Sequence, residues 1–296
     1  MANAQPAVLG STNRGRVVTN HTSGRRQTTA LPIYIALTIG AVLVMLPFFW
    51  MITTSFMTLP ETVTYPPHWF PQSPQPQNYP TAWTKAAFPR YVVNTIFIAT
   101  CTTFASLVTS SLAAYAFAQM NFFGKNVVFV ALLATLMIPF EVTMIPDFLV
   151  IKKLGWYNTY MAQIIPWSAS VFSVFLLRQF FSGLPKDLWE AAQLDGSTHV
   201  QYLLRVIVPL STPALTTAGL FTFLGSWNSF VWPLIVTKED TMRPIQVGLS
   251  YFIQEEGVQW HLLMAGATIT ILPVIVVFLF VQRQFIEGIA RSGLKG

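Results

Sequence analysis

The sequence predicts an all-α, polytopic membrane protein with six transmembrane helices. Apolar residues make up 53% of the 296 residues and charged residues only 9%, whereas soluble domains carry about 25% charged residues. Long uncharged stretches also recur along the chain, and each exceeds the roughly 18–20 residues that cross the hydrocarbon core of a membrane as a helix. These two observations argue against a water-soluble enzyme and against a disordered regulator.

The uncharged stretches are continuous and do not alternate in polarity at every second residue, which favours helices over a β-barrel. Glu141 alone interrupts the third stretch, near one end. The predicted helices cover residues 31–56, 91–117, 126–146, 159–180, 208–236 and 262–283. On the second of them, small residues at a spacing of four predict close helix–helix packing: Thr102, Ser106, Ser110, Ala114 and Ala118.

An even number of spans places both chain ends on one side of the membrane. Lysine and arginine mark the cytoplasmic side, and 11 of the 17 lie in the ends and in the loops on that same side. We therefore predict a basic cytoplasmic tail at 1–29, a membrane domain at 30–284 and a cytoplasmic tail at 285–296. The basic amino end then contacts lipid headgroups and is not a nucleic-acid-binding arm.

The first outer loop, at about 57–90, is rich in proline between Pro60 and Pro80. Extended polyproline conformation suits such a segment. It is then either a strap over the outer face or a plain connector, and the connector is the simpler alternative.

The loop at about 182–209 is predicted to form two short helices beside the membrane. Pro185 fits the first turn of the first helix, and Gly196 stops that helix in a left-handed cap. Ser197 caps the second helix, and Pro209 ends it. Val200, Leu203, Leu204 and Ile207 would share one apolar face of that second helix at helical spacing.

This loop carries a family resemblance. The run Glu190-Ala-Ala-Gln-Leu-Asp-Gly196, with Pro209 thirteen residues after the glycine, resembles the EAA loop of the inner-membrane permeases of binding-protein-dependent ABC importers. Met137-Ile-Pro139, the segment 154–159, Leu177-Arg-Gln-Phe180 and the ending Gly293-Leu-Lys-Gly296 resemble the smaller, maltose-permease-type subunit of carbohydrate importers. The resemblance covers the chain from about residue 30 to its end.

The resemblance implies a cytoplasmic coupling helix that docks into a separate ATPase. Glu190 would pair with a basic residue of that ATPase, Ala191 and Ala192 would permit close approach, and Asp195 with Gly196 would shape the turn. The implied partners are a second permease subunit, two copies of the ATPase and an extracytoplasmic solute-binding protein, which the outer loop 238–261 would face. The implied location is the bacterial inner membrane.

The chain itself lacks the Gly-x-x-x-x-Gly-Lys-Ser/Thr loop that cradles nucleotide phosphates. ATP and Mg²⁺ would therefore be bound by the partner ATPase, and no cofactor is expected in this chain. One cysteine and four scattered histidines offer no metal site. No catalytic motif lies in the predicted spans, so we expect a transporter subunit and not an enzyme.

A sugar-like solute would need aromatic faces and amide or hydroxyl partners along its path. Trp227 and Asn228 in the fifth span and Trp167 in the fourth are the candidates, with ordinary interhelical packing as the alternative. Pro233 is expected to break the fifth span locally. Glu141 is a further candidate, since ionisable groups within membranes often line pathways. The rival function is a stand-alone secondary carrier, which would need an ion site and usually paired repeats. The sequence does not separate oligosaccharides, polyols and glycerol phosphodiester-type solutes.

Overall fold

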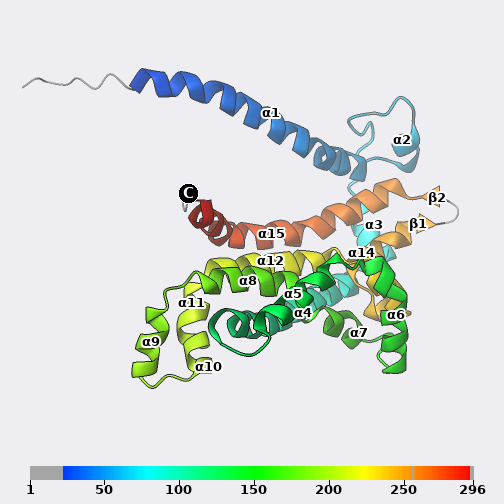
Figure 1. Ribbon diagram of the computed structural model, residues 1–296. Helices are drawn as coiled ribbons and strands as arrows, with labels where there is room; N and C mark the ends of the chain where they lie inside the picture. The colour runs from blue at the N-terminus through cyan, green and yellow to red at the C-terminus, as the bar shows by residue number, and fades with distance from the viewer. Residues whose placement is uncertain (1–22, 255–256, 294–296) are drawn as a thin grey trace, which may run out of the picture. The chain divides into compact units, whose positions relative to one another are not determined.

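The computed structural model describes residues 23–254 and 257–293, which are mostly helical (Figure 1). The chain forms two compact units, Met1–Trp50 and Met51–Gly296. The described part of the first unit is the beginning of helix α1 (Ser23–Ser55). Most of the expected basic tail, residues 1–22, lies outside the described residues, as do residues 294–296 of the expected carboxyl-terminal tail.

All remaining elements belong to the second unit. Its α-helices are α2 (Leu59–Val63), α3 (Asn78–Lys85), α4 (Phe88–Gln119), α5 (Lys125–Ala134), α6 (Phe140–Lys153), α7 (Tyr160–Ile164), α8 (Val171–Ser182), α9 (Asp187–Leu194), α10 (His199–Tyr202), α11 (Val208–Leu210), α12 (Thr212–Trp227), α13 (Val231–Val236), α14 (Ile245–Leu249) and α15 (Trp260–Gly293). The 3₁₀ turns are η1 (Thr135–Met137), η2 (Ile165–Trp167), η4 (Asp240–Met242) and η5 (Ser250–Phe252), and η3 (Leu203–Ile207) is a π-helical turn. Two short antiparallel strands, β1 (Ile253–Gln254) and β2 (Gly257–Val258), form a hairpin.

Four described helical stretches are long and apolar enough to cross a membrane: Leu31–Ser55, Phe88–Gln119, Tyr160–Ser182 and Trp260–Arg283. Two further helix pairs meet the same requirements together but are sharply bent. The described chain therefore has four candidate spans, or six if each bent pair crosses once. The all-α polytopic fold is confirmed, and three of the six predicted helices are found as continuous helices close to their expected bounds. The helix predicted at 159–180 has the expected ends but is interrupted at residues 168–170, between η2 and α8.

The predicted continuous helix at 126–146 is wrong. The stretch Lys125–Met137 meets Phe140–Lys153 at an angle of 100°. Proline disfavours helical backbone at the residue before it, and Ile138 is accordingly extended, with φ −85° and ψ 115°. Pro139 is extended as well and precedes the first turn of α6. The bend therefore follows from the Met137-Ile138-Pro139 sequence, which interrupts the backbone hydrogen bonds of the span.

The predicted helix at 208–236 is also interrupted. His199–Leu210 meets Thr212–Trp227 at 84° around Ser211, so the loop helix continues one residue past Pro209 instead of ending there. A second break at residues 228–230 separates α12 from α13. Pro233 explains this second break, because its ring would clash with the Ser229 carbonyl in a continuous helix. The expectation that Pro233 breaks the span locally is confirmed.

The proline-rich outer segment is not extended throughout. Pro60 lies in α2 and Pro80 in α3, so both ends of the segment are helical. Thr58 caps α2 in a reciprocal capping box with Glu61, which fixes where that helix begins.

Helix α4 is the centre of the second unit and packs against α8 and α12, while α12 also packs against α15. The expected stripe of small residues on α4 is confirmed as a packing face, because Ser106, Ser110 and Ala114 are fully buried. Their small side chains let the neighbouring helices approach closely. This bundle holds α9 and α10 at one end and α14 with the β1–β2 hairpin at the other (Figure 1).

Candidate functional site

The segment between α8 and α12 folds into two short helices joined by a tight turn. Asp187 and Glu190 lie in the first turn of α9, where carboxylates stabilise the positive end of the helix dipole. Pro185 stands just before this helix and not in its first turn. Asp195 is the last half-helical residue, and Gly196 follows with φ +73°. The left-handed stop predicted at Gly196 is confirmed, and glycine adopts that conformation without steric cost.

The second helix begins one residue later than the sequence suggested. Thr198 is its cap, not Ser197: the Thr198 Oγ1 accepts a hydrogen bond from the Gln201 backbone N at 3.3 Å. In return the Gln201 Oε1 accepts a hydrogen bond from the Thr198 backbone N at 2.9 Å. This reciprocal capping box satisfies two backbone donors that the helix itself cannot satisfy.

The buried face of the second helix differs from the predicted one. Leu203 and Ile207 are buried as expected, but Val200 and Leu204 are 60% and 61% exposed. Tyr202 takes their place and is 1% exposed. The buried face is therefore centred on Tyr202, Leu203, Val206 and Ile207, because the Tyr202 ring packs against Trp189 and Tyr115.

An aromatic cluster ties the two loop helices to the bundle. The Trp189 ring of α9 stacks on the His199 ring of α10, with centroids 4.4 Å apart. The His199 Nδ1 lies 2.7 Å from the Tyr115 hydroxyl oxygen on α4, which makes a hydrogen bond between them. Tyr202 packs against both Trp189 and Tyr115. Because three elements meet in these contacts, the loop is an extension of the packed core.

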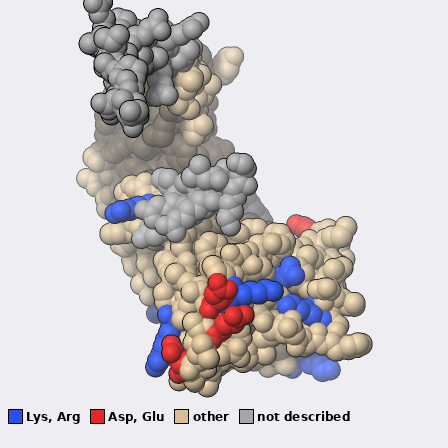
Figure 2. Space-filling model, turned by 60° about the vertical axis from the view of Figure 1, so that its left-hand side comes forward, with Lys and Arg blue, Asp and Glu red and all other residues tan. Residues whose placement is uncertain are grey.

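The outward side of α9 is exposed and carries part of the predicted motif. Ala192 is buried against the cluster, whereas Glu190 and Ala191 are exposed and Leu194 is 91% exposed. The Glu190 carboxylate has no ion-pair or hydrogen-bond partner within residues 23–254 and 257–293. Figure 2 shows acidic and basic side chains close together at the end of the molecule that α9 and α10 form. This end therefore exposes the Glu190 carboxylate beside the small Ala191 side chain, so another protein can approach the helix closely.

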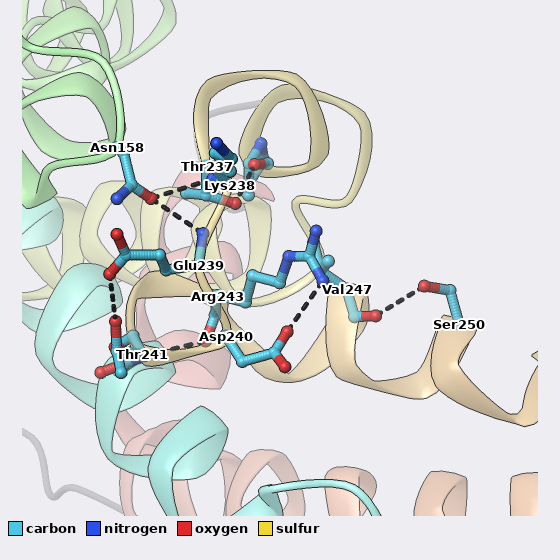
Figure 3. A network of polar contacts seen from close by, with 11 residues as sticks. Asn158, Thr237, Lys238, Glu239, Asp240, Thr241, Arg243, Val247 and Ser250 are labelled. Carbon is cyan, nitrogen blue, oxygen red and sulfur yellow. Dashed lines mark hydrogen bonds and ion pairs between the residues drawn. The ribbon is translucent and has the colours of Figure 1, made fainter.

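At the opposite end, the loop at 237–244 is held by side chains of other elements. Asn158 accepts hydrogen bonds from the backbone N atoms of Lys238 and Glu239 at 2.9 and 3.1 Å, and Arg243 pairs with Asp240 at 2.8 Å (Figure 3). Asn94 of α4 donates to the carbonyl oxygens of Thr241 and Arg243, both at 2.9 Å. Side chains from α4 and from the segment before α7 thus fix the course of this loop.

A cavity of about 460 Å³ lies between α4, η2, the start of α8, α12 and α13. Aromatic side chains line it, as do hydroxyl and amide groups, and none of the described lining residues is charged. The aromatic residues are Trp167, Phe172, Phe221 and Trp232, and the polar residues include Thr95, Thr102, Gln163, Ser170, Ser226 and Ser229. Its volume lies in the roughly 300–1,000 Å³ range of small-molecule sites.

The structure does not gather the four expected pathway residues in one place. Trp167 lines the cavity. Trp227 is 1% exposed and stacks on Phe223, so it packs between helices. Asn228 is exposed, and its Oδ1 accepts a hydrogen bond from Gln246 at 3.4 Å. Glu141 is exposed in the first turn of α6 and does not line the cavity.

The sequence reasoning missed Gln163 and Thr102, which are 2% and 1% exposed and both line the cavity. Gln163 is an amide within the fourth predicted span, and a polar side chain at such a position is a signal that could have been weighed. Thr102 was noted only as a packing residue on α4.

Comparison with known proteins identifies the family of this chain. Residues 106–291 match the family described as binding-protein-dependent transport system inner membrane component. An arabinooligosaccharides transport system permease protein of Halalkalibacterium halodurans is 38% identical over 69% of this chain and 73% of its own length. A trehalose/maltose transport system permease protein of Thermococcus litoralis is 34% identical over 88% of this chain and 97% of its own length. A chain of the crystal structure of a bacterial ABC transporter that imports the acidic polysaccharide alginate superposes with a TM-score of 0.77 at 24% identity, covering 90% of this chain and all of its own.

The fold and the matches therefore define the class: an inner-membrane, multi-pass permease subunit of an ABC importer. The chain belongs to the binding-protein-dependent transport inner membrane component family, and within it resembles the permeases of carbohydrate importers. It is a transport subunit and not an enzyme; it works with an extracytoplasmic binding protein, and ATP is bound by a partner ATPase.

Proposed function

We propose that this permease imports a sugar or sugar-like solute as one half of a heterodimeric translocation pathway. The second half is another permease subunit, and two copies of an ABC ATPase bind on the cytoplasmic side. Both termini are cytoplasmic, with tails at 1–29 and 285–296 flanking the membrane domain at 30–284. The sugar-transporting relatives named above and the aromatic, hydroxyl-lined cavity support this proposal.

The loop at about 182–209 is the proposed contact with the ATPase. Glu190 pairs with a basic residue of the ATPase, and the exposed Ala191 keeps the surface low enough for close docking. Ala192 supports the same helix from its buried side, and Asp195 with Gly196 form the turn that presents α9. Closure of the ATPase dimer would then move α9, and the aromatic cluster would pass that movement to α4. Such rigid-body coupling needs a stiff connection between the docked element and the bundle.

The proposal rests on two features of α9: the Glu190 side chain is exposed, and the helix that carries it is held firmly against the bundle. The Glu190 carboxylate faces solvent without a partner among the described residues, although the helix beneath it is anchored through Trp189, His199 and Tyr115. A solvated surface helix would not need that anchoring. A docking element needs it, because a force applied at Glu190 must reach the spans.

Co-purification tests the proposal. A tagged chain is isolated from native membranes in mild detergent, and its companions are identified by mass spectrometry. We expect a second permease and an ABC ATPase with the wild-type chain. Gly196→Val should reduce the recovered ATPase about five- to thirtyfold, since valine at φ +73° costs about 1–2 kcal/mol in the turn. Glu190→Ala should also reduce it, because it removes the carboxylate that pairs with the ATPase. The control is Glu239→Ala, on the loop at the opposite end of the bundle.

The outcomes separate the two functional classes. Loss of the ATPase in both loop variants, with the second permease retained, supports the coupling role. A chain that purifies alone and moves solute into liposomes without ATP is a stand-alone secondary carrier, and the proposed function is then wrong.

A further inference from the structure

Two basic side chains at the junction of α4, α5 and α8 have no acidic partner. The Lys125 Nζ donates a hydrogen bond to the Met120 carbonyl oxygen at 2.7 Å, just past the end of α4. The Arg178 Nε donates to the Phe117 carbonyl oxygen at 3.4 Å, in the last turn of the same helix. Neither cation forms an ion pair within the described part of the chain. The junction therefore carries two positive charges that no described carboxylate neutralises.

These two cations lie close together and have hydrogen-bond donors to spare. Their charges are near enough to repel each other, and both residues are partly exposed, so an anion can reach them. The Arg178 guanidinium carbon lies 4.0 Å from the centroid of the Phe129 ring on α5, which holds the side chain over the junction. An ammonium group has three N–H donors and a guanidinium group five, so donors remain on each cation after its bond to α4. A bound anion would accept from them and relieve the repulsion.

An open pocket of about 320 Å³ lies beside Lys125, at the turn between α4 and α5. Its other lining residues are uncharged, and two of them, Asn121 and Asn126, have exposed amide side chains that can donate and accept hydrogen bonds. Gly124 lies between them with φ +75° and turns the chain into α5. Because the lining contains no carboxylate, a phosphate group would meet donors there without repulsion from an acidic side chain.

Exposed apolar side chains surround this pocket. Phe122 and Val127 line it and are 43% and 73% exposed, and the neighbouring Phe123 is fully exposed. A free phosphate ion would gain nothing from such a surface, whereas an acyl chain would remove it from water. A phospholipid supplies both the anionic headgroup that the cations need and the apolar chains that this surface fits.

The position of the pocket along the spans also fits a lipid headgroup. Lys125 begins the bent helix pair that starts with Lys125–Met137, and Arg178 lies four residues before the end of the candidate span Tyr160–Ser182. Both cations therefore stand at the same boundary of the membrane, where long basic side chains reach the lipid headgroups. In the proposed orientation this boundary faces the cytoplasm, and the cytoplasmic leaflet carries anionic lipids.

We infer that the junction of α4, α5 and α8 is a binding site for an anionic phospholipid, whose phosphate is held by Lys125 and Arg178. Asn121 and Asn126 hydrogen-bond the headgroup, and the acyl chains lie against the exposed phenylalanine rings. The site is separate from the cavity described above, because none of these residues lines that cavity. It rests on the proposed function only for the leaflet to which it is assigned.

The test uses the complete transporter, purified with its second permease and ATPases, and follows lipid binding by native mass spectrometry. The probes are dioleoyl phosphatidylglycerol, which is anionic, and dioleoyl phosphatidylcholine, which has the same acyl chains and no net charge. We expect tighter binding of phosphatidylglycerol. Lys125→Gln and Arg178→Gln should each weaken its binding about fivefold, the usual effect of one basic residue at a lipid surface, and should leave phosphatidylcholine binding unchanged.

The matched control is Lys152→Gln, at an exposed lysine in the last turn of α6 that does not line the pocket. This variant should bind phosphatidylglycerol as the wild-type protein does. Arg178→Lys keeps the positive charge and should retain most of the binding, which separates loss of charge from a change in local packing. Inorganic phosphate in large excess should not displace the lipid, because it has no acyl chains.

Equal affinity of the wild-type complex for the two lipids, or an unchanged preference for phosphatidylglycerol in both glutamine variants, overturns the inference. Displacement of the lipid by inorganic phosphate would reveal a site for free anions and would overturn it as well. Recovery of the second permease and the ATPase is measured in the same samples. A complex that keeps these partners without any lipid preference contradicts only the lipid site, whereas a wild-type chain without an ATPase contradicts the proposed function.

Discussion

Glu61 organises the first outer loop through both oxygens of its carboxylate. The Oε2 accepts a hydrogen bond from the Thr58 backbone N at 2.7 Å, while the Oε1 accepts from the backbone N atoms of Gln72 and Ser73 at 3.0 and 3.2 Å. One side chain thereby joins the start of α2 to a segment eleven residues further on. These bonds, and first the bond from Thr58, hold the pKa of Glu61 below its ordinary value of 4.5.

The lowered pKa gives the loop a pH dependence with a definite sign. Because the carboxyl pKa is lower in the folded loop than in the unfolded chain, the contribution of Glu61 is fully present above about pH 4.5. It is lost as the pH falls through the lower, folded value. We expect the amide exchange of Gln72 and Ser73, corrected for intrinsic rates, to accelerate as the pH is lowered from 7 toward 3.

The matched variant is Glu61→Gln, which keeps the size of the side chain and removes the charge. In this variant the backbone amides of Gln72 and Ser73 should exchange faster than in the wild-type protein already at pH 7. Their exchange rates, corrected for intrinsic rates, should no longer change as the pH is lowered. Equal protection of Gln72 and Ser73 in both proteins at pH 7, measured by hydrogen-exchange mass spectrometry, would show that the carboxylate does not hold the loop.

At the residue scale, the sequence predicts the features that depend on neighbouring residues in the chain, such as helix caps and helix stops. Gly196 was assigned correctly because few residues other than glycine stop a helix in the left-handed conformation. The neighbouring cap was misplaced by one residue, since Ser197 and Thr198 have similar capping chemistry and only Thr198 has Gln201 three residues later to complete the box. Gln163 offered one sequence signal, an amide within the fourth predicted span, but its burial and its bond to the Met242 carbonyl depend on packing between α4, α7 and the 237–244 loop.

Helices α9 and α10 act as one element because their aromatic side chains pack together. Trp189 and His199 stack, Tyr202 closes the side, and the Tyr115 hydroxyl bonds to His199 from α4. Apolar residues of α8 and α12 complete the same core cluster. If the loop is the contact with the ATPase, this cluster determines how stiffly movement of α9 reaches α4.

The hydrogen bond between Tyr115 and His199 can be tested by a double-mutant cycle. Tyr115→Phe and His199→Phe each remove the bond while keeping an aromatic ring in the cluster. Each should lower the free energy of unfolding by about 0.5–1.5 kcal/mol, the usual net contribution of one hydrogen bond. The double variant should lose less than the sum of the two single variants, because the same bond is removed by both.

Unfolding by SDS titration in mixed micelles provides these free energies, and ATPase stimulation by the binding protein reports coupling in the same variants. We expect coupling to fall together with stability in both single variants. Strictly additive losses of stability would mean that the two side chains act independently, and the cluster would then not be a single mechanical connection.

The element scale also shows why length and hydropathy alone overestimated helix continuity. Uncharged stretches predicted the apolar spans, and three of the six are continuous helices. The interrupted spans contain prolines whose consequences depend on the neighbouring backbone: Ile138 and Pro139 become extended, and the chain turns by 100° there. The buried face of the second loop helix was likewise decided by tertiary packing, since Tyr202 packs against Trp189 and Tyr115 while Val200 and Leu204 stay exposed.

The second unit, Met51–Gly296, has two chemically different ends. One end carries the α9–α10 loop, where Lys186, Asp187, Glu190 and Arg205 are all exposed. The other end carries the β1–β2 hairpin and the 237–244 loop, whose Arg243 is already paired with Asp240 (Figure 1). The excess of lysine and arginine on one set of segments assigns the α9–α10 end to the cytoplasm in our proposal.

This orientation is open to a direct labelling test. The single cysteine, Cys101, is replaced by serine, and one cysteine is introduced at each of three exposed positions: Gln77→Cys, Gln193→Cys and Lys238→Cys. With a membrane-impermeant maleimide, Gln77→Cys and Lys238→Cys should label in intact spheroplasts. Gln193→Cys, on α9, should label only after the membrane is permeabilised. The control is denatured protein, in which all three must react equally. Labelling of Gln193→Cys in intact spheroplasts would invert the proposed topology, and α9 could then not meet an ATPase in the cytoplasm.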